Sequence, residues 1–382
     1  MRNPFNARVL RRSLMADGAR IATPHKPSGT GTGLMTVAAA LALLMPAFAV
    51  RAGDNQPAGS RPGEVRVLAS GLMGTIGSTI GPDGALYVAE GAAGRITRID
   101  LSTGKATTFA SGLPAAVPGV GLGGPMDIAF VGTTAYVLVG VVDSAVGGNQ
   151  KDGIYRVEDR YHSTLLVDLG TWSSNHPPDP IVPFNYFLPD GVQFALQPIH
   201  DGFLVSDGHL NRVLHVSKDG TEITVLKQFN DVVPTGLAKS GDTVFLAVLG
   251  PVPETPDTGK VVSFGLHDTH PLAPAHAVAS GVSMVVDTKF GANAKLYALS
   301  QGIAPVGIQP GEPASPNTGR LMRVNYDGTF TILVDRLDQP ASLNFVCNTA
   351  YIITLTGEVL EVKDVGELAD QDRACNRCDH RD

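Results

Sequence analysis

The sequence predicts an all-β fold: a six-bladed β-propeller built from four-stranded blades. Three observations predict this fold. A short apolar strand recurs six times along the chain, a second strand of alternating polarity follows each copy, and glycine (44) and proline (27) are abundant. Such a composition is typical of many short elements joined by turns. With 382 residues, 43% of them hydrophobic, the chain can bury a large core.

The two recurring strands define the repeat. The first is ALYV at 85–88, AYVL at 135–138, FLVS at 203–206, VFLA at 244–247, LYAL at 296–299 and AYII at 350–353. The second is GRITRID at 94–100, GIYRV at 153–157, NRVLHV at 211–216, GKVVSF at 259–264, GRLMRV at 319–324 and GEVLEV at 357–362. Because the second strand alternates apolar and polar residues, we expect it to be half-buried.

An outer strand follows in five of the six units, at 107–113, 163–170, 224–229, 276–282 and 331–337. After residue 362 the sequence is polar, whereas VRVLASGL at 65–72 precedes the first unit. We therefore expect the N-terminal strand to complete the last blade and close the ring. Closure removes the exposed sheet edges that promote aggregation.

The innermost strands also share a starting pattern of small residues, which suits six strands crowded around one axis. The segments are 75–77, 125–127, 189–191, 234–236, 285–287 and 340–342. Asp127 and Asp287 are exceptions, because a carboxylate replaces a small residue there.

The ends of the chain differ in composition from the repeats. We predict a signal peptide with its lead-in at 1–52, a linker at 53–64, the propeller at 65–363 and a polar tail at 364–382. The apolar run at 34–49 ends in Ala47-Phe48-Ala49, a plausible cleavage site. An uncleaved anchor is the alternative, although about 16 residues is short for a membrane span. Cleavage predicts a periplasmic or extracellular protein without a membrane span.

Charge excludes one class of partner. Residues 1–52 hold seven of the 29 Lys and Arg residues and one of the 36 acids, which leaves a formal charge of −13 on the rest. An acidic surface repels phosphate backbones, so we do not expect nucleic acid as a partner.

Three cysteines are present. Cys375 and Cys378 lie in CNRCDH, where Asp379 separates the second cysteine from the histidine and so excludes a haem-attachment motif. A local disulfide or two free thiols in a disordered tail are the remaining interpretations. Cys347 is expected in a strand as a small buried hydrophobe.

Several segments resemble a known family. PDGALYVAE, ASGLP, ASGV, GPMDIAF and VVDTKFG are similar to sequences of the ScyD/ScyE family of exported propellers, over about residues 64–363. More distant resemblance is to NHL-type, streptogramin-lyase-like and gluconolactonase-like propellers. The resemblance implies a six-bladed fold and export, and it implies no established reaction. The first blade departs from the pattern, because MGTIG at 73–77 stands where relatives carry residues like Asn-Pro-Arg-Gly.

The long insertions all fall into two classes of loop. Residues 141–152, 251–258 and 302–317 join second to third strands, and residues 173–188 link two blades. Both classes emerge on the same face of a propeller. Because loops on a rigid scaffold commonly carry function, we predict that this loop-bearing face binds a small molecule or a protein partner.

Five carboxylates are expected near that face. Asp127, Asp190 and Asp287 lie at inner strand starts, and Glu90 and Asp207 lie at second strand ends. Glu90, Asp127, Asp190 and Asp287 are candidate ligands of a divalent cation such as Ca²⁺. Gluconolactonase-like propellers hold such a metal. The alternative is that these carboxylates cap backbone N–H groups around a water-filled channel.

Histidines complete the candidates. His176 lies in a proline-rich link on the loop-bearing face, and His209 follows Asp207 in SDGH. A streptogramin-lyase-like enzyme would need a histidine base, for which His209 is the better candidate, with Glu90 as a second catalytic candidate. The sequence leaves three hypotheses open: a binding protein, a metal-dependent lactonase or lyase, and a structural envelope scaffold. It contains no GxSxG, Walker or Rossmann motif on a suitable element.

Overall fold

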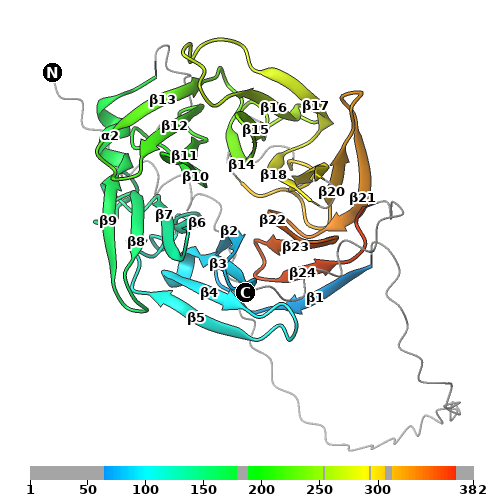
Figure 1. The fold of residues 1–382 in the computed structure, drawn as a ribbon, viewed down its shortest axis with the longest axis horizontal. Helices are drawn as coiled ribbons and strands as arrows, with labels where there is room; N and C mark the ends of the chain where they lie inside the picture. The colour runs from blue at the N-terminus through cyan, green and yellow to red at the C-terminus, as the bar shows by residue number, and fades with distance from the viewer. Residues whose placement is uncertain (1–63, 179–187, 253, 292–293, 306–311, 367–382) are drawn as a thin grey trace, which may run out of the picture. The chain divides into compact units, whose positions relative to one another are not determined.

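The computed structural model describes residues 64–178, 188–252, 254–291, 294–305 and 312–366. These residues belong to a compact unit that spans 61–382. They form six antiparallel sheets of four strands each, the predicted six-bladed propeller (Figure 1).

The strands of blades 1 to 5 run in chain order from the inside of the ring outwards, and in blade 6 the N-terminal strand is outermost. They are β2 (Thr75–Ile80), β3 (Leu86–Glu90), β4 (Arg95–Ile99) and β5 (Ala106–Ser111) in blade 1; β6 (Gly124–Val131), β7 (Thr134–Gly140), β8 (Gly153–Val157) and β9 (Ser163–Asp168) in blade 2; β10 (Gln193–Ile199), β11 (Gly202–Asp207), β12 (Arg212–Ser217) and β13 (Ile223–Gln228) in blade 3; β14 (Pro234–Ser240), β15 (Thr243–Val248), β16 (Gly259–Gly265) and β17 (His276–Val282) in blade 4; β18 (Val285–Phe290), β19 (Leu296–Ser300), β20 (Gly319–Val324) and β21 (Phe330–Leu337) in blade 5; and β22 (Pro340–Val346), β23 (Thr349–Thr354), β24 (Val359–Val362) and β1 (Val65–Ala69) in blade 6.

The inner strands contact one another in a closed circle, β2 to β6, β10, β14, β18, β22 and back to β2. In blade 6 the N-terminal strand β1 pairs antiparallel with β24, and Val65 lies opposite Val362. The sixth sheet therefore contains strands from both ends of the ring, which ties the first blade to the last.

The hydrophobic core lies between neighbouring blades, not within any one sheet. An aromatic side chain on a second strand packs against the inner strand of the next blade in three places. The ring centroids are 4.8 Å apart for Tyr87 and Phe130, 5.2 Å for Phe245 and Phe290, and 4.7 Å for Tyr297 and Phe345. Buried aromatic pairs stabilise beyond their area alone, so these contacts help to fix one blade on the next.

Within the described residues three short helices interrupt the repeat, all on one side of the blades. η1 (Gly91–Ala93) and η2 (Ser144–Val146) lie in loops between second and third strands. α2 (Leu169–Asn175) begins the link between blades 2 and 3, and the Asp168 side chain caps it by accepting a hydrogen bond from the Thr171 amide. The loop-bearing face is therefore where the chain departs from the scaffold.

Some sequence-based predictions lie outside the described residues: the signal peptide, its cleavage site, and Cys375 and Cys378 in the tail. The prediction for Cys347 was wrong. This residue lies in the turn between β22 and β23 with φ of 52° and is half-buried, because the strand ends at Val346. Among the described helices none is long and apolar enough to cross a membrane.

Candidate binding pocket on the loop-bearing face

The long loops share one end of the blades. In an antiparallel four-stranded blade, the loop between the second and third strands and the link to the next blade emerge at the same end. The β7–β8, β15–β16 and β19–β20 loops and the β9–β10 link all belong to these two classes. The predicted loop-bearing face is thus a feature of the fold.

A pocket of about 420 Å³ opens on this face between the β7–β8 loop and α2. Four of its lining residues are the aspartates Asp143, Asp152, Asp168 and Asp190, one is Lys151, and the others are uncharged and polar. We call it the aspartate pocket. Its volume lies in the range of small-molecule sites, which is about 300–1,000 Å³.

The first turn of α2 brings three of these aspartates together. A Cβ atom placed on Gly170 would lie 3.1 Å from Asp152 Cβ, 3.5 Å from Asp190 Cβ and 3.6 Å from Asp143 Oδ2. The absence of a side chain at Gly170 lets the helix approach the three carboxylates closely. Ser174, one turn further along α2, donates a hydrogen bond to Asp190.

Burial, together with the crowding of carboxylates, raises the pKa values of two aspartates. Burial raises the pKa of Asp190 to about 8, and a hydrogen bond to Asp143 and repulsion from that carboxylate act in the same direction. Burial also raises the pKa of Asp152 to about 7, aided by repulsion from Asp143. At neutral pH the Asp190 carboxyl group is therefore mostly protonated, since a carboxyl group buried beside another acid resists ionisation.

The lysine of the pocket is already paired. Lys151 Nζ lies 2.8 Å from Asp168 Oδ2 and donates to Thr171 Oγ1 at 3.1 Å. Its closest contacts are thus with the cap of α2, while Asp143 and Asp190 attract its charge from further away. The pocket keeps an excess of carboxylates.

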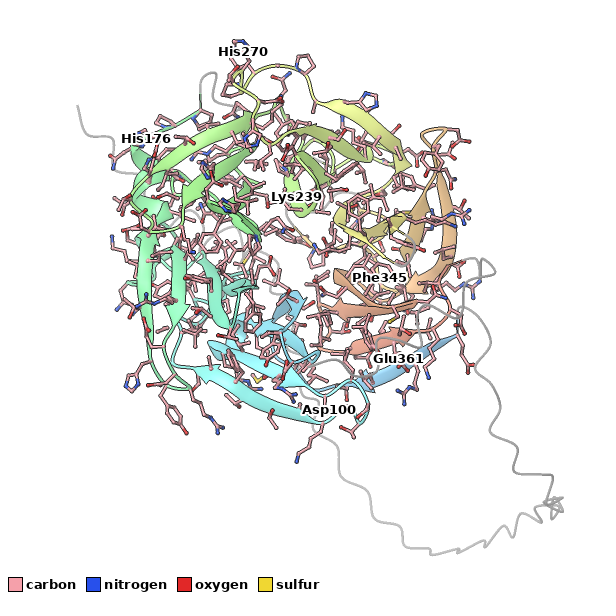
Figure 2. The ribbon with its side chains drawn as sticks, in the orientation of Figure 1. Asp100, His176, Lys239, His270, Phe345 and Glu361 are labelled. Atoms are coloured by element: carbon pink, nitrogen blue, oxygen red, sulfur yellow. The ribbon has the colours of Figure 1, made fainter. Side chains whose placement is uncertain are left out.

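The helix that forms this wall is anchored to blade 3. The rings of Trp172 and His176 stack with centroids 4.3 Å apart, and Arg212 Cζ lies 5.1 Å from the Trp172 ring. Arg212 Nη1 also donates to the His176 carbonyl oxygen at 2.7 Å. Figure 2 shows His176 beside α2 at the edge of the ring. The predicted binding residue His176 therefore ends and anchors α2, and it does not line the pocket.

Glu90 has a full set of partners. It is completely buried, and its two oxygens accept hydrogen bonds from Arg95 Nε and Nη2, both at 2.8 Å. Thr97 Oγ1 and the Met73 amide donate to the same carboxylate. Burial disfavours the charge, yet the hydrogen bonds from Arg95, Thr97 and Met73 together lower the pKa of Glu90. This arrangement ties the β1–β2 link to the β3–β4 hairpin, a structural role.

Asp207 takes the equivalent place in blade 3. Asp207 and Arg212 lie opposite each other on β11 and β12, as Glu90 and Arg95 do on β3 and β4. Arg212 Nε donates to Asp207 Oδ2 at 3.3 Å, and the Val192 amide donates to Oδ1 at 3.0 Å. Both side chains of the pair are almost fully buried.

Asp127 and Asp287 lie on the inner strands and join neighbouring blades. Asp127 accepts the Leu196 amide of β10, and Asp287 accepts the Leu343 amide of β22, both at 2.8 Å. Lys289 Nζ donates to Asp287 at 2.8 Å. Burial raises the pKa of Asp127 to about 7, opposed by the Leu196 hydrogen bond and by Lys289.

His209 supports the end of the β9–β10 link. Its Nε2 accepts a hydrogen bond from the Leu188 amide at 2.9 Å, which requires that nitrogen to be unprotonated. Burial lowers the pKa of His209. The ring is therefore held neutral in a structural contact.

The candidate metal ligands do not form one cluster. Glu90 pairs with Arg95, Asp287 pairs with Lys289, and only Asp190 lies in the aspartate pocket. Within the described residues no group of three or more His, Cys, Asp or Glu side chains is arranged to hold a metal ion. The fit to a divalent-cation centre is therefore poor, and we derive no chemistry through a metal.

Sequence reasoning missed three of the four pocket aspartates. It found Asp190, because that residue precedes an inner strand, but not Asp143, Asp152 or Asp168. Asp143 and Asp152 stand near the two ends of the β7–β8 loop, and Asp168 ends β9. The signal available in the sequence was that acids flank both the β7–β8 loop and the β9–β10 link, which emerge at the same end of blade 2.

No family model and no curated protein matches this chain. Solved structures do match its fold. A PQQ-bound aldose sugar dehydrogenase from Streptomyces coelicolor has a TM-score of 0.54 at 14% identity, covering 79% of this chain and 99% of its own. A gluconolactonase from Xanthomonas campestris has 0.53 at 12%, covering 78% and 89%, and a calcium-binding regucalcin from Agrobacterium tumefaciens has 0.51 at 14%, covering 79% and 94%. These neighbours are six-bladed propellers, and at such identities the likeness shows the fold alone.

Proposed function

We propose that this chain is an exported propeller that binds a small organic cation in the aspartate pocket. The observation that carries the proposal is that four aspartates line one pocket, with three of them brought together at Gly170. A bound cation would replace the proton on Asp190 and relieve the repulsion between the carboxylates. The favourable binding free energy comes from negative charge on the pocket carboxylates that the folded chain leaves uncompensated.

The size and spacing of the pocket favour an extended cation. A volume of about 420 Å³ exceeds what a single ion fills, and the carboxylates are not grouped as ligands of one metal. An alkylamine with several ammonium groups can pair with separate carboxylates. The uncharged polar residues of the lining can accept or donate the remaining hydrogen bonds.

Export and membership of the ScyD/ScyE family belong to the same proposal. They are supported by the apolar run at 34–49 and by the resemblance over about residues 64–363. A binding protein outside the cytoplasm would meet its ligand directly, without transport across a membrane.

A metal-dependent lactonase or lyase is the competing hypothesis. Its support is that one structural neighbour is described as a gluconolactonase and another as calcium-binding. Elemental analysis of the purified protein, with unfolding followed in added Ca²⁺, Mg²⁺ and Zn²⁺, tests it. Stoichiometric metal together with metal-dependent stability would favour the enzyme over the binding protein.

The single tryptophan provides the test of the binding proposal. Trp172 is the chain's one tryptophan and lies on α2, whose Thr171, Ser174 and Asn175 line the pocket. We expect spermidine to change the Trp172 emission saturably. Succinate and glucose, an anion and a neutral sugar, should not.

Two variants separate the pocket from the general acidity of the protein. Asp190→Asn should weaken the spermidine response, whereas Asp159→Asn, at the exposed β8–β9 turn of blade 2 outside the pocket, should leave it unchanged. An equal response to spermidine and succinate, or an equal loss in both variants, would refute the proposal. A protein without any small-molecule response would support the structural scaffold instead.

A further inference from the structure

A second cavity lies between blades 3 and 4, on the opposite face from the aspartate pocket. It has a volume of about 190 Å³, and its walls come from β12, β13, the β10–β11 turn and the β16–β17 loop. The turn between first and second strands and the loop between third and fourth strands emerge at the end of the blades away from the loop-bearing face. We call this cavity the rim groove.

The rim groove contains a buried polar atom without a hydrogen-bond partner. His215 on β12 lines the groove, and its Nε2 is buried with no hydrogen-bond partner in the described structure. The nearest carboxylate oxygen, Asp201 Oδ2, is 3.7 Å away, too far for a hydrogen bond. A buried polar atom of this kind is costly unless a further group satisfies it.

The charge of the groove walls determines which ligand group could form a hydrogen bond with His215 Nε2. The acids Asp201 and Asp268 and the histidines His215 and His267 line the groove, while no Lys or Arg does. The nearby Lys227 is almost completely buried and pairs with Asp268 at 3.2 Å. One Asp268 oxygen and the exposed Asp201 carboxylate therefore remain open to a donor. A cation with N–H groups suits these walls, and an anion does not.

The walls are held in place before any ligand arrives. The Gln228 amide on β13 donates to the Pro271 carbonyl oxygen at 3.0 Å, and Asp268 is tied to Lys227. These contacts fix the β16–β17 loop against the edge of blade 3. Binding therefore requires no ordering of a loop, but only the movement of a side chain that covers His215 Nε2, such as the exposed Asp201.

We propose that the rim groove binds a guanidinium group of a small molecule, which donates N–H bonds to His215 Nε2 and Asp201. The planar fork of a guanidinium presents donors from two nitrogens side by side, which matches two acceptors 3.7 Å apart. Its weak hydration also suits the apolar side chains of Leu226 and Pro271 in the walls. A strongly hydrated ammonium would lose more on entering.

Ring spectra of ¹⁵N-histidine-labelled full-length protein test this site, with methylguanidinium chloride as the probe. We expect saturable shifts of the His215 ring signals, and a much weaker response to methylammonium chloride. Asp201→Asn removes one charged acceptor from an exposed turn and should weaken binding at least about tenfold, which is about 1.4 kcal/mol. The matched control is His270→Ala, in the same β16–β17 loop at the rim of the ring (Figure 2), which should change nothing.

Three outcomes would overturn the proposal. The first is the absence of a saturable shift of the His215 signals, in which case only a bridging water satisfies this ring. The second is an equal response to methylammonium and methylguanidinium. The third is unaltered methylguanidinium binding in Asp201→Asn. A fourth arm uses the peptide acetyl-Gly-Arg-Gly-amide. If this peptide binds far more tightly than methylguanidinium, the ligand is the arginine side chain of a protein partner and the small-molecule assignment is wrong.

Discussion

Asp127 and Asp287 occupy the same position in opposite blades of the ring, and each joins its own inner strand to that of the next blade. Each accepts one amide from the following residue of its own strand and one from the neighbouring blade, all at 2.8 Å. They differ in one respect: Asp287 has Lys289 as an ion-pair partner, whereas Ala129 stands at the corresponding place in the strand of Asp127.

This difference predicts unequal effects of substitution. An asparagine has one acceptor oxygen, so Asp127→Asn leaves one of two backbone N–H groups unsatisfied, at a cost of about 1–3 kcal/mol. Asp287→Asn has the same effect and in addition leaves the Lys289 ammonium without its carboxylate. We expect the greater loss of unfolding free energy in Asp287→Asn, measured in urea at pH 7. Equal losses would show that Lys289 contributes nothing through this pair.

Asp127 also predicts how stability depends on pH. Its pKa in the folded protein is about 7, above the value of about 3.9 in an unfolded chain. The folded state therefore holds a proton that the unfolded state loses between about pH 4 and 7, and stability falls as pH rises through that interval. Urea unfolding at several pH values should show this decline for the wild type and a flatter curve for Asp127→Asn. If the stability of the wild type and that of Asp127→Asn depend on pH in the same way, the assignment of this decline to Asp127 is contradicted.

Glu90 is predicted to be a structural residue and not a catalytic one. Glu90→Gln places an amide against four donor groups and removes the charge opposite Arg95, so we expect a loss of about 3–5 kcal/mol. The control is Asp83→Asn in the same blade, where the Arg98 pair is solvent-exposed and contributes about 1 kcal/mol at most. If the Glu90→Gln variant is as stable as the Asp83→Asn variant, the catalytic hypothesis for Glu90 is open again.

The fold could be predicted from the sequence because the same pattern of strands and turns is repeated six times. A period of two along each strand and turns at regular places leave few alternatives, and the strand at 65–69 compensates for the missing outer strand. The partners of Glu90 and Asp207 could also have been predicted, because Arg95 and Arg212 each follow five residues later, across a short hairpin. The register of that hairpin places acid and base opposite each other.

The aspartate pocket could not be predicted in the same way. Its acids come from the β7–β8 loop, the end of β9 and the start of blade 3, and no period relates them. Their approach depends on α2 and on the missing side chain at Gly170. Single positions such as Asp190 can be recognised from a strand start, but distances between loops arise only from the closed ring.

The pocket also predicts a trade-off between stability and binding. Asp190→Asn removes one of two carboxyl groups that repel each other, so the ligand-free variant should be slightly more stable than the wild type. The same change should weaken binding of a cation. Opposite signs in these two measurements cannot arise from misfolding of the variant.

Calorimetric titration of spermidine into wild type and Asp190→Asn at pH 6 and pH 8.5 tests the central claim most directly. Because protons held by Asp152 and Asp190, with pKa values of about 7 and 8, compete with the ligand, wild-type affinity should rise from pH 6 to pH 8.5. Asp190→Asn should bind at least about tenfold more weakly at pH 8.5, and Asp159→Asn should match the wild type. A wild type that releases no heat with spermidine at either pH, or that binds it no better than Asp190→Asn does, would contradict the account.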